Sequence, residues 1–326
     1  LEELRAAGRA APACFVDDDP EKIGRRIRGV PVRGPIDRLG DCLAGGGVEE
    51  VLLALPSLGA ARRGEILRIC ASLGVQARLL PGAYALLESG LTSGLRPVRL
   101  EDLLGRPTAL FDPERTRGLL AGRRVLVTGA GGTIGGQLCR EIAKQGPSLL
   151  VALDICENGV YDLQQELRAR RGAACPLRVE IGSIRDKGRL EDIFARSRPE
   201  VVFHAAAHKH LPLMEDCPGE AVKNNVFGTA NLIEAAKKHG CRRFVLISTD
   251  KAVRPSSVMG ATKRLCELLV QSQPAQGECL FSAVRFGNVL GSSGSVLPLF
   301  EKQIAWGGPV TVTHRGCTRY FMTVQE

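Results

Sequence analysis

The feature that most constrains this chain is a glycine-rich turn between an apolar strand and a predicted helix. Val125–Leu138 reads VLVTGAGGTIGGQL and places Gly129, Gly132 and Gly135 three residues apart. Because glycine has no Cβ, a phosphate can approach such a turn closely, and the following helix offers free N–H groups and its positive dipole end. The spacing therefore predicts a βαβ unit that binds the pyrophosphate of a dinucleotide.

An acidic residue stands at the matching distance from this turn. Asp154 ends the next predicted strand, 25 residues after Gly129, where a carboxylate can bind ribose hydroxyls. It would repel a 2′-phosphate, so NAD is favoured over NADP. A run of small residues, Ala205 to Ala207, follows a later strand and suits a backbone close to a flat cofactor, although such runs more often serve packing. The predicted cofactor residues here are Gly129, Gly132, Thr133, Ile134, Gly135, Asp154, Ala205, Ala206 and Ala207.

Strands and helices alternate through the second part of the chain. Continuous apolar strands between helices predict an α/β fold with a doubly wound parallel sheet, covered on both faces. The expected strands are 124–127, 149–153, 177–181, 200–204, 243–248 and 280–285. One helix is expected from the glycine-rich turn to about residue 144. The other expected helices span 159–170, 187–196, 219–239 and 259–271.

The first part has the character of a smaller α/β unit. Two strand-like segments, 50–55 and 75–80, flank a helical pattern at 61–73. The chain opens without Met inside an apparent helix, so we expect a fragment of a longer protein. The expected organisation is a partial Rossmann-like domain at 1–81, a linker at 82–122 and a dinucleotide-binding domain at 123–326, truncated at its C-terminus.

Composition narrows the classes of partner. The net charge is +9, and residues 121–326 carry +8 of it. These charges are dispersed and not interleaved with aromatic residues, which argues against nucleic acid. The longest uncharged runs, 51–61 and 286–300, are too short to span a membrane. The eleven cysteines form no CxxC pair, so reduced, buried thiols are favoured over zinc or disulfides.

A short polar segment at the end of the fifth strand is the candidate for chemistry. Asp250 and Lys251 are adjacent, opposite in charge and next to Thr249. Strand ends at the open edge of a doubly wound sheet are the usual place for reacting groups. Met259 and Lys263 follow four residues apart and would share one helix face.

These motifs together resemble a known family. TGAGGTIG, HAAAHKHLPLMED, NNVFGTANLIEAA, STDKAVRPSSVMGATKR and RFGNVLGSSGSVLPLF are similar to the CapD-like nucleotide-sugar dehydratase/epimerase family of polysaccharide biosynthesis, over roughly residues 80–326. Members are extended short-chain dehydrogenase/reductases that act on UDP-activated N-acetylhexosamines. Their helix face usually carries Tyr-x-x-x-Lys. Met259 stands at the Tyr position here, which fits the long, membrane-attached subgroup.

The resemblance implies an NAD-dependent 4,6-dehydratase that converts UDP-N-acetylglucosamine to a 4-keto-6-deoxy sugar. Asp250 would be the acid that protonates the departing C6 hydroxyl, and Lys251 the base that removes the C5 proton. Thr249 would bond near the sugar O4, and Lys263 would hold the nicotinamide ribose. The identity of the group that removes the O4 proton is left open, with Asp250 and a water as the two alternatives.

The resemblance also assigns further contacts. Ser183 stands where the family usually has an adenine-contacting Asp, and Asn225 lies on the helix that flanks the cofactor. The alternative to a substrate contact for Arg285 and Arg319 is that both are ordinary surface charges. The His208–His210 triplet has no carboxylate or cysteine that would complete a metal site. The implied substrate residues are Lys209, Arg285, Asn288, Ser295 and Arg319.

Two other functions stay open. A UDP-hexosamine 4-epimerase would have the same fold, and Met259 with Ser183 would also fit a nucleotide-binding module without turnover. The expected partner is a UDP-sugar, with no metal and no nucleic acid, in a homo-oligomer. We expect a cytoplasmic location at the inner face of a bacterial membrane, with membrane contact only through a segment outside this sequence.

Overall fold

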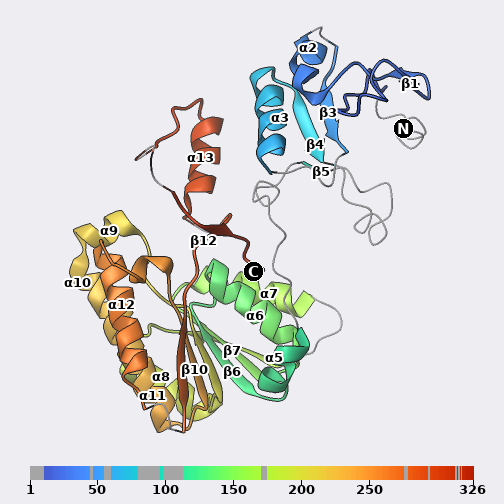
Figure 1. Cartoon of the computed structure of the whole chain (residues 1–326). Helices are drawn as coiled ribbons and strands as arrows, with labels where there is room; N and C mark the ends of the chain where they lie inside the picture. The colour runs from blue at the N-terminus through green and yellow to red at the C-terminus, as the bar shows by residue number, and fades with distance from the viewer. Residues whose placement is uncertain are drawn as a thin grey trace. The chain divides into compact units, whose positions relative to one another are not determined.

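The computed structural model divides the chain into two compact units, Leu1–Pro107 and Thr108–Glu326 (Figure 1). It describes residues 11–44, 47–54, 60–79, 96–97, 113–169, 175–274, 278–292, 294–312, 314, 316 and 318–326. Most of the expected linker, the helix expected at the start of the chain, and the expected element ends Leu55, Leu80 and Arg170 lie outside these residues.

The first unit is a small α/β fold. Strands β3 (Glu50–Leu53) and β4 (Gln76–Leu79) are parallel and connected through helix α3 (Ala60–Ser72), as the apolar pattern indicates. Leu53, Ile66 and Cys70 belong to its core. The remaining elements are β1 (Arg26–Ile27), β2 (Val30–Pro31), η1 (Ile36–Arg38), α2 (Leu39–Ala44) and β5 (Arg96–Pro97), which pairs antiparallel with β4.

The second unit is built on a six-stranded sheet in which all neighbouring strands are parallel, in the order β11-β10-β9-β6-β7-β8. This order confirms the doubly wound fold, and it reverses between β6 and β9, where the carboxyl ends of strands open a crevice for ligands. The strands are β6 (Arg124–Thr128), β7 (Leu149–Asp154), β8 (Leu177–Ile181), β9 (Val201–His204), β10 (Arg243–Ile247) and β11 (Leu280–Val284).

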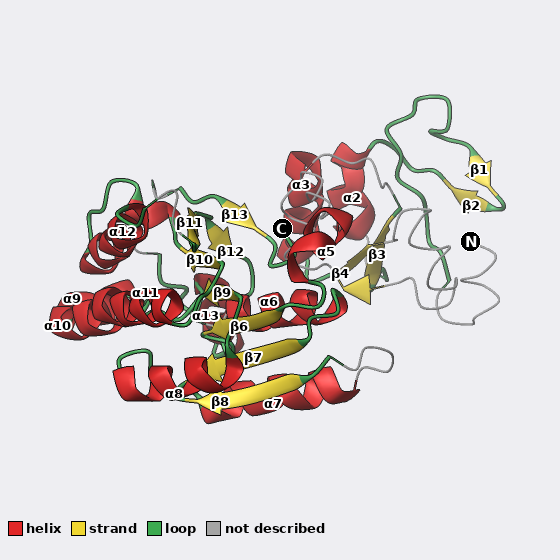
Figure 2. Cartoon of the chain, turned by 90° about the horizontal axis from the view of Figure 1, so that it is seen from below, coloured by secondary structure: helices red, strands yellow, loops and turns green. Residues whose placement is uncertain are grey.

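Helices cover both faces of this sheet (Figure 2). Val125 and Val127 pack with α6 and α7 on one face, whereas Leu126 packs with α8, α11 and α12 on the other, so both sides of a strand are apolar. The helical segments are α5 (Pro113–Leu120), α6 (Thr133–Lys144), α7 (Glu157–Ala169), α8 (Lys187–Ser197), α9 (Leu211–Asp216), α10 (Pro218–Ala221), η3 (Val222–Phe227), α11 (Gly228–Lys238), η4 (Asp250–Ala252), α12 (Val258–Gln271) and α13 (Val296–Ala305).

The structure departs from the sequence expectations in several places. The helix expected over 219–239 is divided by the π-helical turn η3. Helices α9 and α13 were not expected, nor was the parallel pair β12 (Asn288–Val289) and β13 (Phe321–Met322). Helix α5 falls inside the segment expected to be a linker. Within the described residues, no helix combines the length and apolar character needed to cross a membrane.

Candidate active site

The glycine-rich turn forms a cradle that only glycine allows. Gly129 follows β6 with a φ of 70°, and a Cβ there would lie 2.6 Å from the backbone nitrogen of Ala206. A Cβ on Gly135, in the first turn of α6, would overlap the carbonyl oxygen of Gly129. The turn is thus packed directly against the Ala205–Ala206 backbone. The predicted proximity of Ala205–Ala207 to a flat cofactor stays a prediction. A turn without side-chain bulk at the start of a helix such as α6 fits a dinucleotide pyrophosphate.

Asp154 is held beside this cradle by two backbone donors. The N–H of Gly131 donates to Oδ2 at 2.8 Å, and the N–H of Cys156 donates to Oδ1 at 2.9 Å. Each oxygen keeps a further lone pair for a ribose hydroxyl. The close contact between Gly131 and Gly159 was not predicted from the sequence. A Cβ on Gly131 would come within 3.1 Å of the Gly159 backbone at the start of α7. The available signal was a glycine near the start of each of two successive helices.

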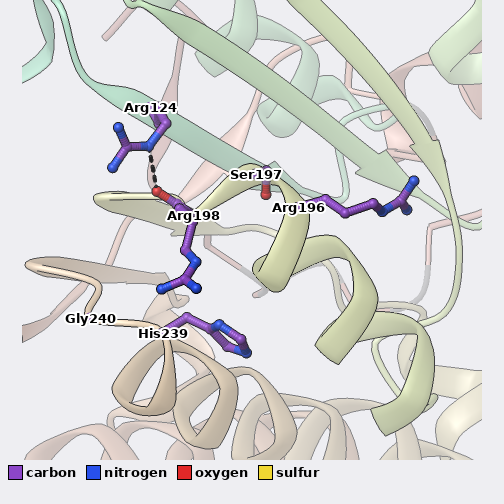
Figure 3. Close-up of a pocket in the computed structure, with 6 residues that line it drawn as sticks. All are labelled: Arg124, Arg196, Ser197, Arg198, His239 and Gly240. Atoms are coloured by element: carbon purple, nitrogen blue, oxygen red, sulfur yellow. Dashed lines mark hydrogen bonds between the residues drawn. The ribbon is translucent and has the colours of Figure 1, made fainter.

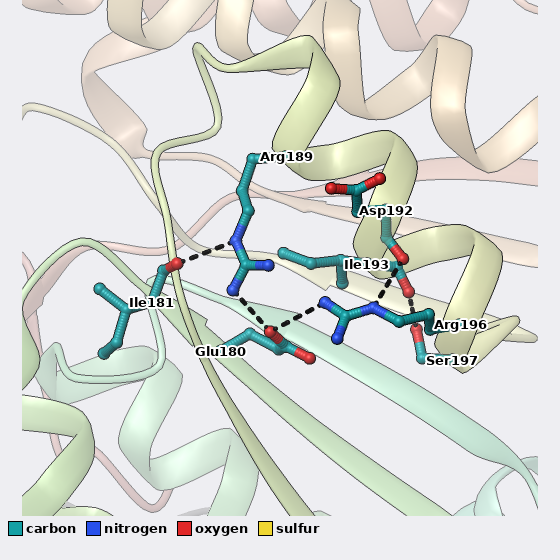
Figure 4. A network of polar contacts seen from close by, with 7 residues as sticks. All are labelled: Glu180, Ile181, Arg189, Asp192, Ile193, Arg196 and Ser197. Carbon is teal, nitrogen blue, oxygen red and sulfur yellow. Dashed lines mark hydrogen bonds and ion pairs between the residues drawn. The ribbon is translucent and has the colours of Figure 1, made fainter.

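The end of β8 carries the Ser183 loop. Ser183 Oγ accepts the N–H of Arg185 at 3.2 Å, which shapes the turn that follows the strand. Arg189 of α8 reaches back to the two residues that end β8. It donates to the carbonyl of Ile181 at 3.1 Å and to the buried carboxylate of Glu180 at 2.7 Å (Figure 4). The loop is therefore anchored to α8. The adenine contact of Ser183 stays a prediction.

A buried histidine lies beneath the cradle. The ring of His204 is within 2.8 Å of Thr128 Oγ1 at Nδ1 and within 3.0 Å of Thr229 Oγ1 at Nε2. Burial, together with the positive charge of Lys263, lowers the pKa of His204 to about 3, so its imidazole is neutral at physiological pH. It links β6, β9 and α11. Sequence reasoning missed it, although it opens the HAAAHKH motif.

Asn225 connects the π-helical turn to the loop after β9. Its Oδ1 accepts the N–H of His208 at 2.8 Å, while its Nδ2 donates to the His208 carbonyl and to Thr262 Oγ1, both at 3.1 Å. The side chain is 1% exposed. Its amide is thus engaged in holding η3, the loop and α12 together, and a direct cofactor contact stays a prediction. π-Helical turns occur frequently at functional sites.

The expected catalytic segment forms one hydrogen-bonded cluster. Lys251 Nζ donates to Asp250 Oδ1 and to Asn288 Oδ1, each at 2.9 Å. Thr249 Oγ1 also donates to Asp250 Oδ1 at 2.9 Å. Burial raises the pKa of the Asp250 carboxyl, but the hydrogen bonds from Lys251 and Thr249 outweigh it and hold that pKa below its ordinary value. The structure therefore brings the predicted acid, base and one predicted substrate residue together.

Met259 and Lys263 lie on the buried face of α12, as their spacing predicted. Met259 packs against Met214 and Ala221, so it belongs to a small apolar cluster and has no proton to exchange. Lys263 Nζ donates to the carbonyl of Ile247 at 2.7 Å, directly before the segment predicted to be catalytic. Burial lowers the pKa of Lys263, and the neighbouring acidic groups oppose that change only in part.

The other predicted substrate residues have different surroundings. Arg285 is taken up by a bidentate ion pair with Glu267, with nitrogen–oxygen distances of 2.7 and 2.6 Å. Ser295, at the start of α13, has a buried Oγ with no hydrogen-bond partner among the described residues. Arg319 is exposed and donates to the Thr318 carbonyl at 2.8 Å. Lys209 is exposed in the loop after β9. The substrate roles of these four residues stay predictions.

An open pocket of about 480 Å³ lies at the amino ends of the strands of the sheet (Figure 3). Arg198 and His239 line it from the C-terminal ends of α8 and α11. It lies apart from the cradle and the Asp250–Lys251 cluster, which follow the carboxyl ends of the strands. Its lining residues are Arg124, Arg196, Ser197, Arg198, His239 and Gly240.

Comparison with known proteins extends the sequence resemblance. Residues 125–326 match the family described as "Polysaccharide biosynthesis protein". The chain is 43% identical to the capsular polysaccharide biosynthesis protein CapD of Staphylococcus aureus over 98% of its length, and it spans about half of that relative, 54%. It is 33% identical to a UDP-N-acetylglucosamine 4,6-dehydratase (inverting) of Campylobacter jejuni, over 63% of this chain and 61% of that protein.

Solved structures agree with this assignment. Pen from Bacillus thuringiensis is 36% identical with a TM-score of 0.59, covering 63% of this chain and 62% of Pen. The UDP-glucose 4-epimerase of Thermus thermophilus, solved in complex with NAD, is 26% identical with a TM-score of 0.53, covering 62% of this chain and 71% of the epimerase. The chain therefore belongs to the CapD-like polysaccharide-biosynthesis family of nucleotide-sugar dehydratases and epimerases.

Proposed function

We propose that this protein is an NAD-dependent UDP-N-acetylhexosamine 4,6-dehydratase with UDP-N-acetylglucosamine as substrate. The observation that carries the proposal is the contact of 2.9 Å between Lys251 Nζ and Asp250 Oδ1 at the carboxyl end of β10. Elimination of water across two neighbouring carbons needs a base for one and an acid for the other, and this pair supplies both.

The pair can reach its working state by an internal proton transfer. When NAD is bound, it would supply reversible hydride acceptance from the sugar. Moving one proton from Lys251 Nζ to Asp250 Oδ1, along their hydrogen bond, gives a neutral amine and a carboxylic acid without changing the net charge. A sugar that covers the pair removes water from it, which favours the neutral form.

Within the elimination step the proton transfers balance. Lys251 Nζ accepts the C5 proton, and Asp250 donates its proton to the C6 hydroxyl, which leaves as water, so both residues return to the charged pair while Asn288 Oδ1 keeps Nζ in place at 2.9 Å. Completing the 4-keto-6-deoxy sugar would then require a hydride from the bound cofactor at C6 and the return of the proton on Lys251 Nζ to C5, and the proton lost earlier from O4 would restore the charge on Lys251. Thr249 would bond near the sugar O4, since Met259 offers no hydroxyl there.

Three further observations support the substrate and the cofactor. The Campylobacter relative carries this activity in its name. Residues 121–326 hold +8 of the net charge, which suits two bound diphosphates. The carboxylate of Asp154 beside the cradle favours NAD over NADP. A homo-oligomer and membrane attachment of the whole protein remain predictions from the family resemblance.

Mass spectrometry tests the proposal directly. Incubation with NAD and UDP-N-acetylglucosamine should yield a product lighter by one water. Lys251→Ala should abolish this loss while NAD still binds, because the cradle is untouched. Lys187→Ala is the matched control, since Lys187 is an exposed lysine paired with Glu234 on the outer helices. Turnover that persists in Lys251→Ala would exclude its role as the base.

A UDP-hexosamine 4-epimerase is the second candidate, because the Thermus neighbour with a TM-score of 0.53 has an epimerase activity of this kind in its name. It would give a product of unchanged mass with inversion at C4. A binding module would retain NAD and the nucleotide sugar without any product. The same incubation therefore separates all three functions.

A further inference from the structure

Glu267 is a charged residue that the proposed chemistry does not use. It lies on α12, one turn after Lys263, and is 1% exposed. Its Oε1 accepts the Ser248 hydroxyl at 2.6 Å and Arg285 Nε at 2.7 Å. Its Oε2 accepts Arg285 Nη2 at 2.6 Å and Arg264 Nη1 at 2.9 Å. Four donors thus occupy the acceptor sites of one carboxylate.

Such an arrangement is costly for a residue that only fills space. A buried carboxylate loses its hydration, and apolar residues of similar volume often stabilise a protein as well as a buried ion pair does. Ser248 after β10, Arg285 after β11 and Arg264 on α12 itself all donate to Glu267. The cost of burying this carboxylate therefore points to a role in fixing the segments that carry its partners.

The partners of Glu267 lie directly before the reacting groups. Ser248 immediately precedes Thr249 in the chain, and Arg285 is three residues before Asn288. Beyond the ends of β10 and β11 the two segments stay paired, because the Ser248 N–H donates to the Val284 carbonyl at 2.7 Å. The N–H of Asp250 continues this pairing to the Phe286 carbonyl at 3.0 Å.

Helix α12 holds the end of β10 at two consecutive residues. Lys263 Nζ binds the carbonyl of Ile247, and Glu267 binds the hydroxyl of Ser248. These two side chains are one helical turn apart, so they fix both the translation and the rotation of the strand end relative to the helix. Arg285 adds the end of β11 to the same anchor.

We propose that Glu267 is a positioning residue for the Asp250–Lys251–Asn288 cluster. Through Ser248 it sets where the catalytic segment leaves β10, and through Arg285 it sets where the chain that carries Asn288 leaves β11. The inference rests on the proposed function. It also gives Arg285 a supporting role, in place of the substrate contact that the family resemblance implies.

Glu267→Gln tests this proposal, because glutamine keeps the shape and removes the charge. The matched control is Glu200→Gln, since Glu200 also bridges two arginines, Arg123 and Arg124, but at the amino edge of the sheet. We expect Glu267→Gln to lower kcat by about 10²-fold, the effect of a displacement of about 1 Å at a reacting group. The KM for UDP-N-acetylglucosamine should change less than twofold. Glu200→Gln should leave both constants near wild type.

The variant Ser248→Ala tests the same proposal if Glu267→Gln does not fold. Ser248→Ala removes one hydrogen bond, and its kcat should fall by about tenfold, a tenth of the larger effect. Hydrogen exchange of the 249–252 amides gives a readout independent of turnover. It should accelerate in both site variants while NAD remains bound, and stay unchanged in Glu200→Gln.

The outcomes separate the two proposals. A loss of kcat in Glu267→Gln no larger than in Glu200→Gln, with unchanged exchange at 249–252, would overturn the positioning role. If the wild-type protein releases no water from the sugar, but exchange at 249–252 rises only in the site variants, the dehydratase proposal fails and the positioning role stands.

Discussion

The neutral histidine beneath the cofactor cradle makes folding sensitive to acid in a definite pH window. The unfolded chain binds a proton at His204 with a pKa near 6.5, whereas in the folded protein burial and the charge of Lys263 lower it to about 3. The unfolded state therefore gains protons first as pH falls, and the folded state loses relative stability below pH 6.5. From pH 7 to pH 5 the loss amounts to about 2 kcal/mol.

The variant His204→Gln isolates this effect. Glutamine can still reach the two threonine hydroxyls but does not titrate, so its unfolding free energy should lose about 2 kcal/mol less than wild type between pH 7 and pH 5. Glu267, whose pKa is lowered to about 2 by its donors in spite of burial, acts only below this window. The control His239→Gln changes another histidine, which is bonded to Glu191, and leaves His204 and its two threonine partners in place.

Urea unfolding at the two pH values measures the difference. Circular dichroism follows the transition, and hydrogen exchange of peptides from β9 identifies the transition of the larger unit. If His204→Gln and wild type lose the same stability on acidification, the buried neutral histidine is not the origin of the acid sensitivity.

Two further substitutions test the glycine cradle and the role of Met259 on α12. Gly135→Ala places a Cβ against the Gly129 carbonyl, so NAD should bind about 5- to 150-fold more weakly, as expected for about 1–3 kcal/mol of backbone strain; calorimetric binding at wild-type level would contradict this. Met259→Tyr adds volume to the buried contact with Met214 and should cost about 1–3 kcal/mol in urea unfolding without raising turnover, whereas a faster enzyme would show that a hydroxyl is missing there.

The sheet could be predicted from the sequence because its strands are buried on both faces. An apolar run bounded by turns has few alternatives in such a fold, and the expected strand 177–181 coincides with β8. The π-helical turn could not be predicted, since it depends on contacts of Asn225 with His208, which is distant in the chain. The pair β12–β13 joins two-residue strands far apart in sequence, and nothing local marks them.

The site shows the same division. Spacing alone placed Asp154 beside the cradle, because the length of a βα unit is nearly fixed. Glu267 escaped notice, since a single acid in a helix usually faces solvent and its arginine partner comes from another strand. Asn288 was expected near the sugar, but its contact with Lys251 requires the path of the chain after β11.

The short parallel pair β12–β13 has a consequence for how this fold can diversify. The N–H of Asn288 donates to the Tyr320 carbonyl at 2.8 Å, and that of Leu290 donates to the Met322 carbonyl at 2.9 Å. The excursion that carries α13 is therefore closed at its base beside Asn288. Doubling the length of such a loop costs only about 0.6 kcal/mol. Mutation and insertion can thus alter the excursion over generations while the Asp250–Lys251 pair stays in place. If this pair has its proposed role in proton transfer, new specificities can arise without rebuilding the chemistry.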